Sequence, residues 1–171
     1  MKNLIMSLSI LMSIFLMSNS QTDNTDWDNK KVESFVRKTA NSSLMEVQVS
    51  QLVLQKASSQ QVKDFAYMMV QDHSVINLKL QSAVKNSKID IPTTLDSEFQ
   101  NKIDKVNKET GNEFDKSYMD LMVNDHKENI KNLEEASTKV TDPDLKNWIE
   151  NTLSELKSHL DNAERIRMQF N

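Results

Sequence analysis

Three histidines form the pattern in this 171-residue chain that is most typical of a chemical site. His73 and His126 end two nearly identical stretches, Met-Val-Gln-Asp-His and Met-Val-Asn-Asp-His, which lie 53 residues apart. Such a repeat indicates two related helices, each with a histidine near its middle. The third histidine is His159. Neutral imidazole is a common ligand of Zn, Fe, Cu and Mn, so a metal site is the first chemistry to consider.

Each histidine falls at the centre of an apolar stripe when successive residues are placed about 100° apart around a helix. The flanking residues are Val62, Ala66, Met69, Leu80 and Val84 for His73, Met119, Met122, Ile130 and Leu133 for His126, and Trp148, Thr152, Ala163, Ile166 and Phe170 for His159. Burying an imidazole without a partner costs about 1–3 kcal/mol per polar group. Three buried histidines on facing helices therefore need partners, and a metal ion would serve all three.

Carboxylates could complete such a site. Glu46 lies at the edge of an apolar stripe, and Glu155 precedes His159 by one turn. Four helices would then each offer a ligand: Glu46, His73, His126, and His159 with Glu155. The alternative is a polar core network without metal, in which each histidine is hydrogen-bonded to a glutamate or to Tyr118.

Asp72 and Asp125 directly precede their histidines, so they point about 100° away from them. We expect each to pair with Lys or Arg on a neighbouring helix, to accept a hydrogen bond from a histidine of the next helix, or to form an exposed ion pair. Met45, Met69, Met119 and Met122 crowd the histidine faces. Methionine is ordinarily core filler, although thioether with imidazole would favour copper over iron.

The composition predicts the elements that position these residues. One Gly and two Pro in the whole chain favour long uninterrupted helices. The periodicity predicts helices over 32–57 (with a possible break at Asn41-Ser42-Ser43), 60–86, 95–108, 112–139, and from Asp142-Pro143-Asp144 to about 170. The pair Ser58-Ser59 is a short break and the N-cap signal of the helix over 60–86.

The passage 87–111 is too long for a hairpin loop. It should travel the length of the bundle, so that helices 60–86 and 112–139 run parallel with their histidines at one height. The fold class expected is all-α, a ferritin-like four-helix bundle with a long crossover that carries a short extra helix.

The N-terminal residues indicate export. Residues 1–20 combine Lys2, an apolar run over 4–17 and small residues before the expected cleavage point, as in a secretory signal peptide; the alternative is an uncleaved anchor helix. Residues 21–30 are expected to form a flexible leader from which Trp27 docks on the bundle domain, residues 31–171. The location expected is the periplasm, the cell envelope or the medium, with no membrane span after cleavage.

The charge, the cysteine content and the absence of common motifs exclude several classes of function. The net charge of −4 argues against nucleic acid as a partner. With no cysteine, an exported chain must gain its stability from packing. No glycine-rich phosphate loop, nucleophile elbow or zinc-finger spacing is present in the sequence. No pattern indicates an oligomeric state.

A family resemblance rests on several short stretches of the chain. They are Phe35-Val36, Met45-Glu46-Val47, Lys56-Ala57, Met69-Val70-x-Asp72-His73, Tyr118-Met119, Met122-Val123-x-Asp125-His126 and Asp142-Pro143-Asp144-Leu145-Lys146. In these the chain resembles the bacterial family called domain of unknown function 4142, over about residues 31–170. The resemblance implies an exported, ferritin-like helical bundle, often named an outer-membrane protein, without an established activity.

The sequence departs from the di-iron members of the ferritin-like group, whose Glu-x-x-His motifs place a carboxylate three residues before each ligand histidine. Val70 and Val123 stand at those positions here, which favours a mononuclear, histidine-rich site. The leading interpretation is an exported bundle of unestablished activity that is not an enzyme and that could bind one transition metal (Fe, Zn, Mn or Cu) between its helices. The alternatives are a structural or envelope-stress interaction module, with a histidine hydrogen-bond network only, and a degenerate redox enzyme.

Overall fold

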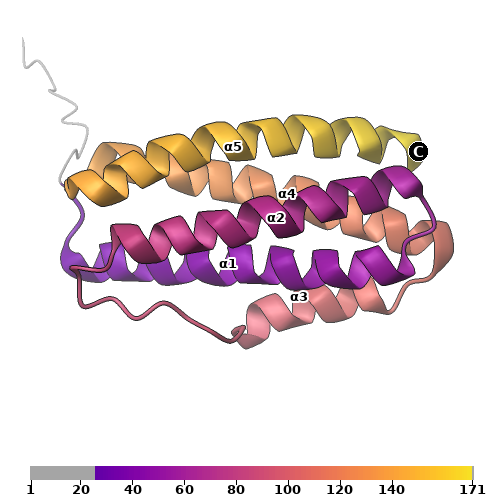
Figure 1. Ribbon diagram of the computed structural model, residues 1–171, viewed down its shortest axis with the longest axis horizontal. Coiled ribbons are helices and arrows are strands. Elements are labelled where there is room, and N and C mark those ends of the chain that lie inside the picture. The colour runs from indigo at the N-terminus through magenta and orange to yellow at the C-terminus, as the bar shows by residue number, and fades with distance from the viewer. Residues whose placement is uncertain (1–25, 171) are drawn as a thin grey trace, which may run out of the picture.

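The computed structural model describes residues 26–170 (Figure 1), so the signal peptide predicted at 1–20 and the first half of the leader, residues 21–25, lie outside the described residues. Every regular element in this range is helical: α1 (Asn29–Lys56), α2 (Gln60–Ala83), α3 (Ser97–Asn107), α4 (Gly111–Lys139), α5 (Pro143–Arg167) and a short 3-10 turn, η1 (Met168–Phe170). The all-α prediction is confirmed. No helix in this range combines the length and the apolar character that a membrane span requires.

The four long helices lie side by side along the long axis of the molecule (Figure 1). α1 packs against α2 and α4, and α5 packs against α4 and α2, which puts α2 and α4 at opposite corners of the bundle. The chain from the end of α2 returns along the outside of the bundle, where α3 packs on α1 and α4. α2 and α4 therefore run in the same direction, and the predicted crossover with its short helix is present.

α1 is one continuous helix, so the break considered at Asn41-Ser42-Ser43 does not occur. Short polar side chains can compete with a helix by bonding to their own backbone. All three side chains here are buried and are bound instead by other parts of the fold. Asn41 shows this most clearly: it accepts from the backbone nitrogen of Asp96 (2.9 Å) and donates to the Asp96 carboxylate (3.0 Å), ahead of α3.

The start of α2 is capped from a different helix. Ser59 is the N-cap residue, as the sequence indicates, but its side chain makes no capping hydrogen bond. The fully buried carboxylate of Asp115, on α4, accepts from the backbone nitrogens of Ser58 (3.1 Å) and Ser59 (2.7 Å). α5 begins as predicted, with Asp142 accepting from the backbone nitrogen of Leu145 (2.8 Å) ahead of the first turn. Asp115 thus ties the α1–α2 connection to α4.

A polar layer divides the apolar core into two parts. One apolar cluster includes Met45, Val49, Phe65, Met69, Phe114, Met119, Met122 and Ala163. The other includes Phe35, Val36, Ile76, Leu80, Leu133, Trp148, Ile149 and Leu156. On every long helix, the chain passes from one cluster to the other through buried polar residues: 41–43 and 46 on α1, 73 on α2, 125 and 126 on α4, and 159 on α5. The histidines occupy this layer.

Trp27 docks on the domain as expected. Its ring packs edge-on against Phe35, with ring centroids 5.5 Å apart, and its backbone nitrogen donates to the Lys139 carbonyl (3.0 Å).

Candidate metal centre

The three histidines converge in the polar layer from three different helices. Ring centroids lie 5.5 Å apart for His73 and His126, 5.4 Å for His73 and His159, and 5.6 Å for His126 and His159. Each ring offers one nitrogen to a group whose members all lie within 4.8 Å of one another. We call these three residues the histidine cluster. They meet because α2 and α4 run parallel with their repeated motifs at one height, and α5 packs against both.

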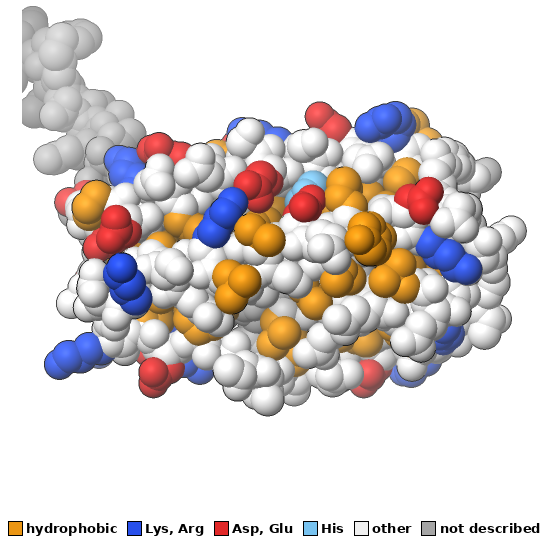
Figure 2. Space-filling model, in the orientation of Figure 1, with side chains coloured by type: hydrophobic (Ala, Val, Ile, Leu, Met, Phe, Trp, Pro, Cys, Tyr) orange, Lys and Arg blue, Asp and Glu red, His pale blue; other side chains and the backbone are white. Residues whose placement is uncertain are grey.

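The cluster is buried from solvent. The exposed fractions are 1% for His73, 0% for His126 and 5% for His159. Figure 2 shows a small patch of histidine at the molecular surface with acidic side chains beside it. His159 is the most accessible of the three rings.

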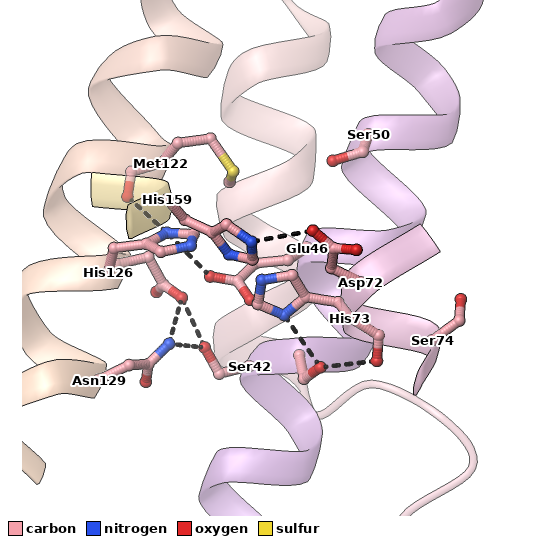
Figure 3. A network of polar contacts seen from close by, with 12 residues as sticks. Ser42, Glu46, Ser50, Asp72, His73, Ser74, Met122, His126, Asn129 and His159 are labelled. Carbon is pink, nitrogen blue, oxygen red and sulfur yellow. Dashed lines mark hydrogen bonds and ion pairs between the residues drawn. The ribbon is translucent and has the colours of Figure 1, made fainter. Parts of the chain in front are cut away.

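One nitrogen of each ring is held by a group outside the cluster (Figure 3). His126 Nδ1 donates to the carbonyl oxygen of Met122 (2.9 Å), and His159 Nε2 donates to the carboxylate of Asp72 (3.0 Å). His73 Nδ1 lies 3.1 Å from Ser43 Oγ, whose own hydrogen is donated to the His73 carbonyl oxygen (3.3 Å). With its one hydrogen on the carbonyl, the serine oxygen accepts from His73 Nδ1, and in this tautomer each of the three held ring nitrogens carries the hydrogen.

The other nitrogen of each ring is free. His73 Nε2, His126 Nε2 and His159 Nδ1 are all buried, and none has a hydrogen-bond partner among the described residues. Because the outward nitrogens carry the hydrogens, these inner nitrogens present lone pairs. An outward nitrogen held by a carboxylate or carbonyl and an inner one left free is the usual state of a metal-binding histidine.

Burial keeps the rings uncharged. It lowers the pKa of His73 from 6.5 to about 4, against the opposing effect of Asp125 and Asp72. Burial, followed by the neighbouring His73, also lowers the pKa of His159. The pKa of His126 is lowered chiefly by burial as well, although Glu46 opposes this. Three neutral imidazoles are in the protonation state that metal binding requires.

Glu46 on α1 lies against the rings and is completely buried. Its Oε2 is 2.7 Å from Nδ1 of His73, and its Oε1 is 3.4 Å from Nδ1 of His126. The carboxyl group thus contacts the outward nitrogens, not the inner ones. Burial raises the pKa of Glu46 well above its usual value; His126 lowers it and the charge of Asp125 raises it further.

Asp125 and Asp72 each take one of the roles expected from sequence. Asp125 accepts from Lys102 Nζ on α3 (2.8 Å) and from the Ser42 hydroxyl, and Asn129 donates to it as well (3.1 Å). Although burial acts in the opposite direction, the hydrogen bonds from Lys102 and Ser42 hold the pKa of Asp125 below its ordinary value. Asp72 instead accepts from a histidine of another helix, as described above.

Two predicted site residues lie apart from the cluster. The Glu155 carboxylate pairs with Lys79 Nζ at 3.5 Å, with 39% of its side chain exposed. The Tyr118 hydroxyl is hydrogen-bonded to Ser50 Oγ (2.8 Å) and not to a histidine; burial raises the pKa of Tyr118 above its ordinary value. Met69 and Met122 are fully buried in the apolar cluster that borders the polar layer.

Sequence reasoning missed several members of the site, namely Ser42, Ser43, Lys102 and Asn129. The run Asn41-Ser42-Ser43 gave a usable signal, because it lies one turn before Glu46 on α1 and is too polar for a core position. On α5, the residue three positions before His159 is the buried Leu156, just as Val70 and Val123 stand three positions before the other two histidines. No carboxylate therefore stands three residues before any histidine of the cluster.

Fold and site together define an all-helical bundle with three histidines meeting in its core. The chain belongs to the family described as domain of unknown function (DUF4142), whose family model matches residues 17–166. The resemblance expected from the doubled motif is thereby confirmed. Comparisons with curated proteins and with solved structures gave no match. The family carries no assigned activity.

Proposed function

We propose that the protein binds one transition-metal ion in the core of its bundle, through His73 Nε2, His126 Nε2 and His159 Nδ1. Two observations carry the proposal: three buried rings each bring one nitrogen to a group whose members lie within 4.8 Å of one another, and each ring has one buried nitrogen without a hydrogen-bond partner among the described residues. Leaving a buried polar atom unpaired costs about 1–3 kcal/mol. A single ion satisfies all three at once.

The distances between the histidine nitrogens would suit a bound ion after small rotations of the rings. Bonds from a transition metal to imidazole are about 2.0–2.1 Å long, so two nitrogens on one ion lie at most about 4 Å apart. Nitrogens within 4.8 Å can reach that separation through small rotations of the rings. The groups on the outward nitrogens, Glu46, Asp72 and the Met122 carbonyl, would fix ring orientation and make the ligands more basic.

The alternative is a structural module in which the histidines form a closed hydrogen-bond network. In such a network each histidine is hydrogen-bonded to a glutamate or to Tyr118, and the contacts of Glu46 with Nδ1 of His73 (2.7 Å) and of His126 (3.4 Å) are of this kind. Within residues 26–170 the inner nitrogens have no such partners, and Tyr118 is occupied by Ser50. This observation favours the metal.

The test is metal titration of protein purified without a histidine tag. Calorimetry with Zn²⁺ and absorption spectroscopy with Co²⁺ should both give one ion per chain. His73→Ala and His126→Ala should each abolish binding, while circular dichroism shows the helical content retained. Thr152→Val, which changes a buried polar residue of α5 two turns from His159, serves as the matched control and should bind as the natural chain does. A natural chain that takes up no metal would contradict the proposal.

Export and the absence of catalysis belong to the same proposal. They rest on the pattern of residues 1–20 and on the lack of a recognisable catalytic motif. Mass spectrometry of the exported protein should show a chain that begins near Gln21, whereas a retained Met1 would contradict cleavage. Oxygen or peroxide consumption by the iron-loaded protein would instead support the redox-enzyme alternative.

A further inference from the structure

The donor atoms of the histidine cluster are all imidazole nitrogens. Among the described residues, the converging group consists of three imidazoles and contains no carboxylate. Hard cations such as Mg²⁺, Ca²⁺ and Mn²⁺ prefer oxygen ligands, so a site of three neutral nitrogens selects against them. The candidates that remain are softer ions.

The cluster is also shielded from solvent. Its rings are at most 5% exposed, and apolar clusters border it on both sides. The cost of moving an ion from water into such an interior rises with the square of its charge, so a monovalent ion costs about a quarter as much as a divalent ion of the same size. By this desolvation cost, a monovalent ion is the easier occupant.

Methionine side chains occupy the layer next to the cluster. Met69 and Met122 each precede their histidine by four residues, so each lies on the same helix face one turn away. Because α2 and α4 are parallel, both methionines lie on the same side of the rings. Both are completely buried.

At the level of these two methionines, the other two helices carry small side chains that leave room for the thioether groups. α1 and α5 run in the opposite direction, so their residues at this level follow Glu46 and His159 by one turn. They are Ser50 and Ala163, both small and fully buried. Figure 3 shows the Met122 thioether and Ser50 on one side of the rings, above them in that view, with Ser42 and Asn129 on the other.

From these observations we infer that the ion is cuprous copper, Cu⁺, held by the three inner nitrogens with a thioether of Met122 or Met69 as an additional ligand. Soft thioether ligands select Cu⁺ among the available ions, and Cu⁺ is stable with three or four ligands. The doubled Met-x-x-x-His spacing then has a chemical role, since each copy supplies one nitrogen and one sulfur to the same region. This inference rests on the proposed function and specifies its ion.

The experiment is an anaerobic competition with a chromophoric Cu⁺ chelator, run beside a Zn²⁺ competition on the full chain. We expect Cu⁺ to bind at least about 100-fold more tightly than Zn²⁺, because thioether ligands favour the softer ion. The variants Met122→Leu and Met69→Leu nearly conserve side-chain volume and should keep the fold. At least one of them should weaken Cu⁺ binding by roughly 10-fold, as losing a weak ligand does, and leave Zn²⁺ binding unchanged.

Met119→Leu is the matched control. Met119 is equally buried in the same apolar cluster but lies two turns from His126, so its substitution should leave both affinities unchanged. X-ray absorption at the copper edge should show a sulfur scatterer that is lost in the double variant M69L/M122L.

Tighter binding of Zn²⁺ than of Cu⁺, or a copper spectrum with nitrogen scatterers alone, would overturn the inference and leave the histidine metal site standing. Failure of the natural chain to bind any of the ions would overturn both.

Discussion

Asp72 of α2 accepts a hydrogen bond from Nε2 of His159 on α5, across the seam between the two helices, at 3.0 Å. This contact determines which nitrogen of His159 is free, because it fixes the hydrogen on Nε2 and leaves the lone pair on Nδ1 directed into the cluster. His159 differs in this from the other two rings, whose Nδ1 atoms are the ones held.

Removing this acceptor should weaken metal binding without unfolding the bundle. Asp72→Ala allows His159 to change tautomer and rotate, and we expect about a 10–100-fold loss of affinity, the usual effect of removing a group that orients a ligand. Asp72→Asn should lose less, because its amide oxygen can still accept. Co²⁺ titration measures both. Asp64→Asn, on the same helix and bonded to Gln60, is the control; an Asp72→Ala chain with natural affinity would refute the role of this contact.

Asp115 should be one of the most important single residues for stability. Asp115→Ala leaves the backbone nitrogens of Ser58 and Ser59 without their acceptor, and hydrogen bonds to a charged group contribute about 1.5–3 kcal/mol each. We expect the free energy of unfolding to fall by about 2–4 kcal/mol in urea denaturation. Ser59→Ala should change it by less than about 0.5 kcal/mol, because the Ser59 side chain caps nothing. Equal losses in the two variants would show that α2 is capped by its own serine.

The buried histidines should make the metal-free protein sensitive to acid. A pKa lowered by folding means that the unfolded chain binds more protons, so stability falls as the pH drops through the window between the two pKa values. For His73 the window runs from 6.5 to about 4, a loss of roughly 3 kcal/mol. His126 and His159, whose pKa values are also lowered, act in the same direction.

The titration of Glu46 changes the stability in the opposite direction, so a Glu46 variant provides a control for the measurement. Its raised pKa makes it a source of stability that is lost as the pH rises from 4.5 through its folded pKa. Glu46→Gln removes that contribution, so the variant should lose stability on acidification more steeply than the natural chain. Urea unfolding of both metal-free proteins between pH 4 and pH 7 measures the difference. Parallel curves for the two would show that Glu46 does not titrate in this range.

The sequence predicted the fold and the meeting of the histidines because both depend on local periodicity. The apolar stripes are properties of single helices, and the long crossover follows from the spacing between them. These suffice to place His73 and His126 at one height on parallel helices. The buried position of Glu46 was predictable for the same reason.

The partners of the histidines could not be predicted, because they depend on how the helices are rotated and shifted against one another. Glu155 illustrates this: it lies one turn before His159, as Met69 and Met122 lie one turn before their histidines, and only the rotation of α5 within the bundle decides whether that position is buried. Its carboxylate lies at the surface beside Lys79. Ser43 and Lys102 reach the polar layer through contacts 30 and 23 residues away in sequence, and no local pattern reports those distances.

The polar layer has a mechanical consequence for the protein. Because it separates the apolar core into two parts, the helices are held together at the middle of the bundle by polar contacts and not by continuous apolar packing. An ion bound there would join α2, α4 and α5 directly, through coordination bonds, at the level where apolar packing is interrupted.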